Sequence, residues 1–238
     1  MKIVLNIIAT NKYTYFLDGI IKSADVYFFP EEEVSILIHS NINPYTLDSL
    51  NYEGRINIEW NYIDHEPWPF PTLKRFEYFL SAKDILSENE YAFYVDVDSV
   101  FIGRIDSSIL PQVGMIGTVH PCLYVGCGTP ERNPVSKAYI PPHANNRYFC
   151  GGFIGGNTDE FIKTSTYIAD NINDDYSRGI IALWHDESHI NKFFYENPPA
   201  MILEAPFAIA ENTQFLEGDY KLLFLDKNSI GGHNFFRS

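Results

Sequence analysis

The chain has 238 residues, of which 45% are hydrophobic and 16% are aromatic. This is enough for one substantial hydrophobic core, so we expect a single domain over residues 1–238. Acidic residues outnumber basic residues by 31 to 17, which gives a net charge of −14. This excess argues against a nucleic-acid-binding protein, because contacts to phosphates need basic patches.

The first hundred residues alternate between short apolar runs and helical patterns. Strand-like runs occupy residues 2–9, 34–38, 56–63 and 91–95. Apolar residues at helical spacing predict a helix over residues 14–28 and another after the proline-rich stretch 67–71, with Thr72 as its N-cap. The alternation predicts an α/β fold, with a mainly parallel sheet and helices on both faces.

The second half of the chain is more mixed. We expect a strand at 115–119, a loop at 121–146, and helices at 159–173 and 187–194. The run 147–156 contains two Gly-Gly pairs in a strand-like context, which marks close approach by backbone or ligand.

The cysteines and the apolar runs bear on location. Cys122, Cys127 and Cys150 are odd in number, which favours reduced thiols over a disulfide framework. No apolar run reaches the roughly 18 residues that a transmembrane helix needs. The start of the chain, from Lys2 to Ala9, lacks the length and cleavage site of a signal peptide. We therefore expect a soluble, cytoplasmic protein without a membrane anchor.

Asp96-Val97-Asp98 closes the apolar run 91–95. Carboxylates at positions i and i+2 of an extended segment point the same way and can bind one hard divalent cation, which usually shares its shell with substrate phosphates. Ligands of open α/β sheets lie at the carboxyl ends of strands, where Ala9, Thr10 and Tyr13 would also lie. The pattern suggests a nucleotide-activated substrate, although solvated loop aspartates produce the same motif by chance.

A second cluster is Trp184-His185-Asp186-Glu187, directly before a helical pattern. Glu187 at a helix start is able to face a pocket. The alternative is that Asp186 is an N-cap and that Glu187 only complements the helix dipole.

Several separated motifs together resemble glycosyltransferase family 6, which includes the histo-blood-group A and B transferases and α-1,3-galactosyltransferases. The resemblance runs from Ala9 to about Lys227 and rests on residues 184–192, 96–98, 120–121, 138–141 and 151–156. It implies a GT-A type glycosyltransferase fold in one Rossmann-like domain, with residues 1–100 binding the nucleotide and residues 101–238 forming the acceptor-binding and catalytic half.

The resemblance also implies roles on the donor side. Asp96 and Asp98 match the ligands of Mn²⁺, with Mg²⁺ as the alternative, and Glu187 matches the glutamate near the anomeric carbon. Positions that match donor or nucleotide contacts are Ala9, Thr10, Tyr13, Arg75, Val97, Cys150, Gly151, Gly152, Asp186, Lys227 and Arg237. Gly152 and the small Cys150 stand where the family selects the donor sugar. The glycine favours UDP-N-acetylgalactosamine over UDP-galactose, and Gly152→Ala is expected to shift preference toward galactose.

On the acceptor side, the matching positions are His120, Thr129, Trp184, His185 and Glu211. The loop from Cys122 to Gly128 departs from the family pattern, as does Asn133. The implied reaction is transfer of N-acetylgalactosamine or galactose in α-1,3 linkage to a β-galactoside, with retention at the anomeric carbon. The alternatives are an inactive glycan-binding module on the same fold and an inverting or hydrolysing sugar-nucleotide enzyme.

Overall fold

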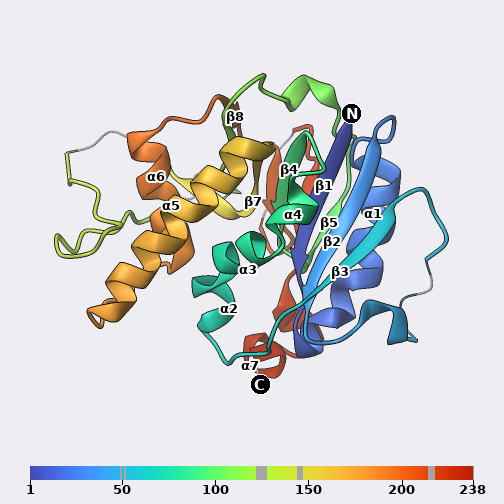
Figure 1. Cartoon of the computed structure of the whole chain (residues 1–238), viewed down its shortest axis with the longest axis horizontal. Helices are drawn as coiled ribbons and strands as arrows, with labels where there is room; N and C mark the ends of the chain where they lie inside the picture. Colours follow the sequence, from blue (N-terminus) through green and yellow to red (C-terminus); the bar gives the residue numbers. More distant parts are fainter. Residues whose placement is uncertain (49, 51, 122–127, 144–146, 214–217, 238) are drawn as a thin grey trace.

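The computed structural model describes residues 1–48, 50, 52–121, 128–143, 147–213 and 218–237. Its centre is a seven-stranded sheet in the order β3-β2-β1-β4-β7-β6-β8 (Figure 1). The strands are β1 (Lys2–Ile8), β2 (Glu33–Ser40), β3 (Asn57–Tyr62), β4 (Tyr91–Val95), β6 (Met115–Val119), β7 (Phe149–Asn157) and β8 (Met201–Leu203).

The central sheet is mixed and mainly parallel, as the sequence predicts. Strand β1 runs parallel to β2 and β4, and β2 runs parallel to β3, whereas β7 is antiparallel to both β4 and β6. The register pairs Asn6 with Tyr94. The carboxyl ends of β1 and β4 therefore lie side by side, and Thr10 and Asp96, which follow these two strands, lie at the same edge of the sheet.

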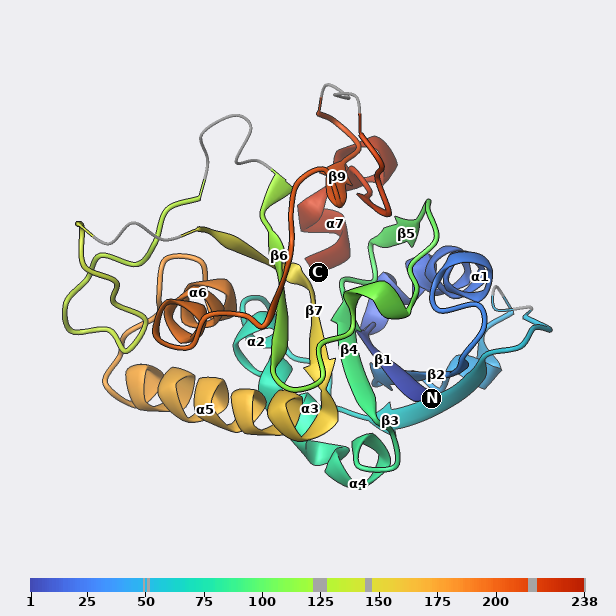
Figure 2. The ribbon, with the colours of Figure 1, turned by 90° about the horizontal axis from the view of Figure 1, so that it is seen from above.

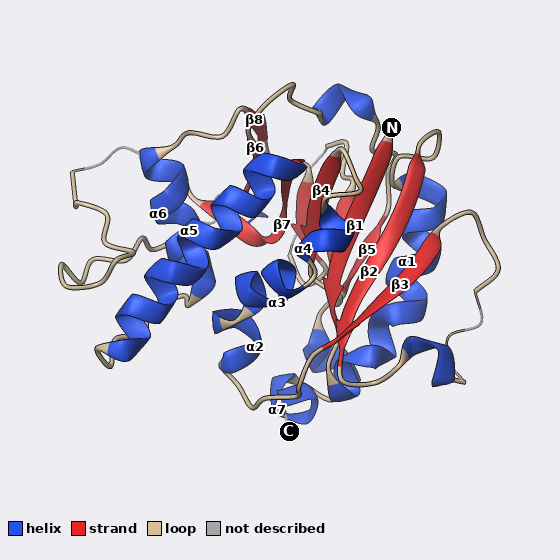
Figure 3. Cartoon of the chain, in the orientation of Figure 1, coloured by secondary structure: helices blue, strands red, loops and turns tan. Residues whose placement is uncertain are grey.

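Helices cover both faces of this sheet (Figures 2 and 3). Helix α1 (Leu17–Tyr27) packs on one face through Leu17, Ile20, Ile21 and Ala24. The other face is covered by α3 (Arg75–Ser81), α4 (Lys83–Leu86), α5 (Thr158–Ser177) and α6 (Asp186–Glu196). Among the described residues, no helix combines the length and the hydrophobicity that crossing a bilayer requires.

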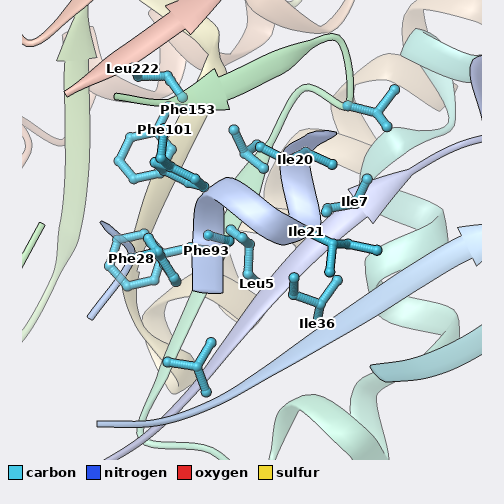
Figure 4. Packing of buried hydrophobic residues seen from close by; sticks show 14 of the residues in the cluster. Leu5, Ile7, Ile20, Ile21, Phe28, Ile36, Phe93, Phe101, Phe153 and Leu222 are labelled. Carbon is cyan, nitrogen blue, oxygen red and sulfur yellow. The ribbon is translucent and has the colours of Figure 1, made fainter. Parts of the chain in front are cut away.

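Aromatic side chains fill the core beneath α1 (Figure 4). The rings of Phe93 in β4 and Phe153 in β7 stack with centroids 5.7 Å apart, and Phe28 meets Phe93 edge-on at 5.4 Å. A Cβ atom at Gly155 would lie 2.2 Å from the Phe93 ring. Close packing against this ring explains Gly155, whereas a Cβ atom at Gly156 would lie 2.4 Å from the Gly114 carbonyl oxygen.

A second, three-stranded sheet lies apart from the main one and was not predicted. It consists of β5 (Ser99–Phe101), β10 (Leu222–Phe224) and β9 (Ala208–Ala210), with β10 in the middle. After it come the 3-10 helix η5 (Lys227–Ile230) and helix α7 (His233–Arg237). This sheet leads the end of the chain back toward Asp98, because Leu225 N–H donates to the Asp98 carbonyl at 2.9 Å.

Two local predictions differ from the structure. Thr72 is not an N-cap, because it lies inside the short helix α2 (Phe70–Leu73) and donates through its hydroxyl to the Pro69 carbonyl at 2.8 Å. The α-helix predicted over residues 14–28 begins three residues later than expected, at Leu17, because residues 11–16 form the 3-10 helix η1 (Asn11–Phe16).

Candidate active site

A cavity of about 220 Å³ opens at the carboxyl ends of β1 and β4. Thr10 and Tyr13 line it from the segment after β1, and Asp96, Val97 and Asp98 line it from the segment after β4. Further walls come from the α2–α3 region and from the end of the chain, through His65, Glu66, Trp68, Thr72, Arg75, Lys227 and Arg237. The sequence-predicted nucleotide residues are therefore brought together, with buried Ala9 behind Thr10.

The two aspartates have different surroundings. Asp96 accepts a hydrogen bond from the Tyr94 hydroxyl at 2.6 Å, and its backbone N–H donates to the Gly152 carbonyl at 2.9 Å. Asp98 pairs instead with the Lys227 ammonium. Burial raises the pKa of Asp98, as does the nearby Asp96 charge, whereas Lys227 opposes the rise.

Cations from the end of the chain close the cavity. Burial lowers the pKa of Lys227, but the charge and the hydrogen bond of Asp98 raise it by more. The pKa of Lys227 therefore lies above its usual value, and the side chain stays charged. Lys227 Nζ lies 5.7 Å from the centre of the Tyr13 ring, and the Arg237 guanidinium stacks at 3.7 Å over Trp68. Positive charge thus lies opposite the aspartates, where a diphosphate would be neutralised.

Arg75, which is 7% exposed, connects the parts of the site. Its Nη1 donates to the Gly151 carbonyl at 2.5 Å, and its guanidinium lies 4.3 Å from the centre of the Tyr94 ring. Its Nε forms an ion pair with Asp186 Oδ2 at 2.8 Å, without the alignment of a hydrogen bond. Burial raises the pKa of Asp186 to about 7, because the opposing charge of Arg75 offsets only part of the cost of burying the carboxylate.

Glu187 lies at the start of α6 with both carboxylate oxygens engaged. Oε1 accepts from the Tyr148 hydroxyl at 2.8 Å, and Oε2 accepts from the Gly151 backbone N–H at 2.9 Å. Burial raises the pKa of Glu187, although these two hydrogen bonds pull it down. His185, two residues before Glu187, has a φ of 51°, which lies in the left-handed region that non-glycine residues rarely adopt. This turn sets where α6 begins and thus where Glu187 points.

A second cavity, of about 300 Å³, shares Asp96, Asp98 and Lys227 with the first. It is lined from the other side by Glu187, Cys150, Gly152, His120 and Glu211. The acidic pair thus lies between the first cavity and a space bordered by Glu187. Such an arrangement suits a sugar held at its anomeric carbon between a departing diphosphate and an incoming acceptor.

Comparison with known sequences decides the family. The sequence profile of Glycosyltransferase family 6 matches residues 1–223. The chain belongs to glycosyltransferase family 6. Its mixed sheet with flanking helices is consistent with the GT-A type fold that the sequence predicts for a family 6 enzyme.

Named relatives come from bacteria and mammals. An O-antigen biosynthesis glycosyltransferase, WbnI, from Escherichia coli is 28% identical over 94% of this chain and 95% of its own length. Histo-blood group ABO system transferase 1 from Rattus norvegicus is 28% identical over 85% of the chain, and Globoside alpha-1,3-N-acetylgalactosaminyltransferase 1 from Homo sapiens is 26% identical over 85%. The chain covers only 59% of the length of each of these two mammalian enzymes.

The other family 6 positions are scattered. Thr129 and Trp184 line neither cavity. The Trp184 carbonyl accepts from the Glu187 N–H at 3.0 Å. A Cβ atom at Gly128, next to Thr129, would lie 2.8 Å from the ring of Tyr148, the residue that donates to Glu187. His185 packs edge-on against Trp68 at 4.9 Å, which places it on the nucleotide side rather than beside His120. The divergent loop residues Cys122 to Cys127 lie outside the described residues, whereas Cys150 is a buried free thiol.

The surroundings of Gly152 differ from expectation. A Cβ atom there would lie 2.7 Å from the Phe224 ring and 2.9 Å from Asp96 Oδ2. The prediction that Gly152 leaves open space for the donor sugar does not hold at the Cβ position. An alanine would press on one of the two predicted metal ligands.

Two tyrosines of this family 6 site were missed by the sequence-based prediction. Tyr94 lies two residues before Asp96 and on the same side of its strand, so the period of two could have identified it. Tyr148 precedes β7 and reaches Glu187 across 39 positions in the chain, which no local pattern reveals.

The residues suit a hard divalent cation only as part of a shared shell. No group of three or more His, Cys, Asp or Glu side chains able to hold a metal occurs within the described part of the chain. Asp96 and Asp98 supply carboxylate oxygens at one cavity, the donor type that Mn²⁺ or Mg²⁺ takes together with phosphate oxygens. The pair therefore fits a cation that binds with its substrate.

Proposed function

We propose that this family 6 enzyme is a retaining, metal-dependent transferase that moves N-acetylgalactosamine, or galactose, from a UDP-sugar to a β-galactoside in α-1,3 linkage. The observation that carries the proposal is the position of the acidic pair between two adjoining cavities, with Glu187 and Lys227 both facing the second one. The name of the globoside relative supports N-acetylgalactosamine and the α-1,3 linkage.

The donor is proposed to bind across the first cavity. Tyr13 and Thr10 offer a ring and a hydroxyl to the uridine, and the diphosphate lies between the aspartates and Lys227. Asp96 and Asp98 would hold Mn²⁺ or Mg²⁺, which when bound neutralises charge that develops on the departing diphosphate. Lys227 and Arg237 add positive charge directed at the same leaving group.

Glu187 is proposed to act at the anomeric carbon. Retention allows two roles for its carboxylate: a covalent nucleophile, as in retaining glycosidases, or a negative charge that stabilises an oxocarbenium-like state while the acceptor attacks. Both roles need the ionised side chain. The hydrogen bonds from Tyr148 and Gly151 favour that form and hold the carboxylate in one orientation.

The donor preference is proposed to be UDP-N-acetylgalactosamine over UDP-galactose. Its support is the name of the globoside relative, together with Cys150 and Gly152, which the family resemblance implies select the donor sugar and which line the cavity beside Glu187. A pocket that merely has room for an extra group discriminates weakly, by about 1–3 kcal/mol, so some use of galactose is expected. A clear preference of the wild-type enzyme for UDP-galactose, measured as kcat/KM, would reject this assignment.

Gly152→Ala tests the local geometry. Because the added methyl group would meet Phe224 and Asp96, we expect kcat/KM to fall for both donors instead of shifting toward galactose. The matched control is Gly19→Ala in α1, where an added methyl group would make only an ordinary contact, 3.7 Å from Val100 Cγ1. If Gly152→Ala instead prefers UDP-galactose and keeps a high kcat/KM for it, the packing argument is contradicted.

The direct test of function is UDP release from a panel of UDP-sugars with Mn²⁺, with and without galactoside acceptors. We expect release that depends on both N-acetylgalactosamine donor and acceptor, with an α-linked product by NMR. Release that ignores the acceptor would indicate a hydrolase, and a β-linked product an inverting enzyme. Glycan binding without release from any donor would favour the alternative, an inactive glycan-binding module. The presence of Asp96, Asp98, Lys227 and Glu187 together argues against that alternative.

A further inference from the structure

A buried carboxylate ties together two segments beside the second cavity. Glu131 is 7% exposed and precedes the Ala138–Pro141 motif, which has no role in the proposed chemistry. Its Oε1 accepts from the backbone N–H of Asn133 at 2.7 Å, and its Oε2 accepts from the backbone N–H of Leu183 at 2.6 Å. One side chain thus bridges two stretches that are about fifty residues apart in sequence.

The loop that carries Glu131 is fixed at its other end as well. Ile140 N–H donates to the Glu131 carbonyl at 2.9 Å, which closes the loop on itself. Asp175 of α5, 1% exposed, accepts from the Ser136 hydroxyl at 2.6 Å and from Lys137 N–H at 2.8 Å. Because the loop cannot shift without breaking these bonds, the Glu131–Leu183 contact transmits a fixed position to the segment before α6.

The bridged segments carry the three family 6 acceptor positions that line neither cavity, Thr129, Trp184 and His185. Thr129 lies two residues before Glu131, and Trp184 directly follows Leu183. Trp184 is held in turn by its own backbone N–H, which donates to the Ser188 hydroxyl at 2.9 Å. A buried carboxylate is costly unless its hydrogen bonds are satisfied, and here they are satisfied only when both segments are in place.

We propose that Glu131 is a positioning residue for the acceptor: its carboxylate fixes the segment of Thr129 relative to the segment of Trp184 and thereby sets the affinity for the acceptor glycan. This rests on the proposed function, since it takes Thr129 and Trp184 as acceptor contacts. Glu131 lines neither cavity and is not a catalytic residue.

The first experiment tests the positioning without any substrate. Glu131→Ala removes both carboxylate oxygens and so leaves the backbone N–H groups of Leu183 and Asn133 without this acceptor. We expect faster hydrogen exchange at the Leu183 amide than in the wild type. Glu160→Ala, which removes a surface carboxylate paired with Lys163, is the matched control and should leave that amide unchanged. Unaltered exchange at Leu183 in Glu131→Ala would overturn the proposal.

The second experiment tests the link to the acceptor. In Glu131→Gln, the acceptor KM should rise about tenfold, the cost of one charge-assisted hydrogen bond, while UDP affinity stays within about twofold. Should this variant fold poorly, Glu131→Asp provides the same test, because the shorter side chain keeps its charge but cannot reach both amides. An unchanged acceptor KM, or an equal loss of UDP binding, would overturn the proposal. Failure of the wild type to use any galactoside would count against the proposed acceptor class, while exchange at Leu183 still decides the positioning.

Discussion

Glu187 receives one hydrogen bond from a side chain and one from the backbone, and these come from the same short segment, residues 148–151. Glu187→Gln keeps the size of the side chain but removes its charge. If the carboxylate acts at the anomeric carbon, we expect kcat to fall by about 10²-fold or more, with little change in donor affinity. Steady-state kinetics and UDP titration separate the two effects. Near-normal turnover in Glu187→Gln would mean that Glu187 has no catalytic role and only lies at the start of a helix.

Tyr148 offers a finer test at the same carboxylate. Its hydroxyl favours the ionised form of Glu187, so Tyr148→Phe should raise the pKa of Glu187 further. Since the ionised form is required, activity is lost as pH falls through this pKa, and the loss should begin at a higher pH in the variant. The pH profile of kcat/KM measures this shift. If Tyr148→Phe lowers activity but leaves the low-pH side of the kcat/KM profile at the same pH, Tyr148 only packs against its neighbours.

At the residue scale, sequence reasoning works where the chain places groups by simple periodicity. Asp96 and Asp98 follow from a strand end, and they do lie in one cavity. The ion pair of Arg75 with Asp186 joins α3 to α6 and depends on helix packing. No spacing in the sequence reveals such a contact. The contact of His185 with Trp68 likewise joins residues more than a hundred positions apart and could not be predicted from spacing.

Strand β2 carries a buried histidine that couples the elements of the sheet. His39 Nε2 lies 3.0 Å from Asn6 Oδ1 in β1, and its Nδ1 lies 3.0 Å from Asn61 Nδ2 in β3. The amide donor at Nδ1 assigns the proton to Nε2, so the imidazole is neutral. Burial lowers the pKa of His39 to about 3. The network thus joins three strands without placing a charge in the core.

This histidine makes stability depend on pH in a defined direction. The unfolded chain takes up the proton near pH 6.5, whereas the folded chain resists it down to about pH 3. Its contribution to the free energy of unfolding should therefore fall by about 1.4 kcal/mol per pH unit as pH drops through this window. Urea denaturation at pH 7 and pH 5 measures the slope, which should be shallower in His39→Gln. An equal slope in both proteins would contradict the assignment.

At the element scale, long periodic segments were predicted best. Strands β1, β4 and β6 appear within one residue of their expected bounds, and α5 extends beyond its expected ends. The second sheet was missed because β5, β9 and β10 have three residues each, too few for any period to show. Helix α2 was missed for a similar reason, since it consists of four residues and begins at Phe70 inside the proline-rich stretch.

In the whole molecule, distant parts of the chain meet at the site. The first strand leads into Thr10 and Tyr13, and the last helix carries Arg237 to the same cavity. The N-terminus itself lies at the other end of β1, away from α7 and the C-terminus (Figure 1). The acidic pair comes from the segment after β4. A net charge of −14 would repel a nucleotide diphosphate at long range, so local cations must offset it. In the proposed mechanism, donor binding therefore depends on Lys227, Arg237 and a divalent ion.

The most direct test of the proposed mechanism is the rate of sugar transfer in excess chelator and after Mn²⁺ is restored, measured for the wild type and for Asp98→Asn. We expect the wild type to lose transfer in chelator and to regain it with Mn²⁺. Asp98→Asn should remain strongly impaired in both conditions, because it lacks one of the two carboxylates that hold the ion and the diphosphate. Full wild-type activity in excess chelator would contradict the proposed metal-dependent mechanism.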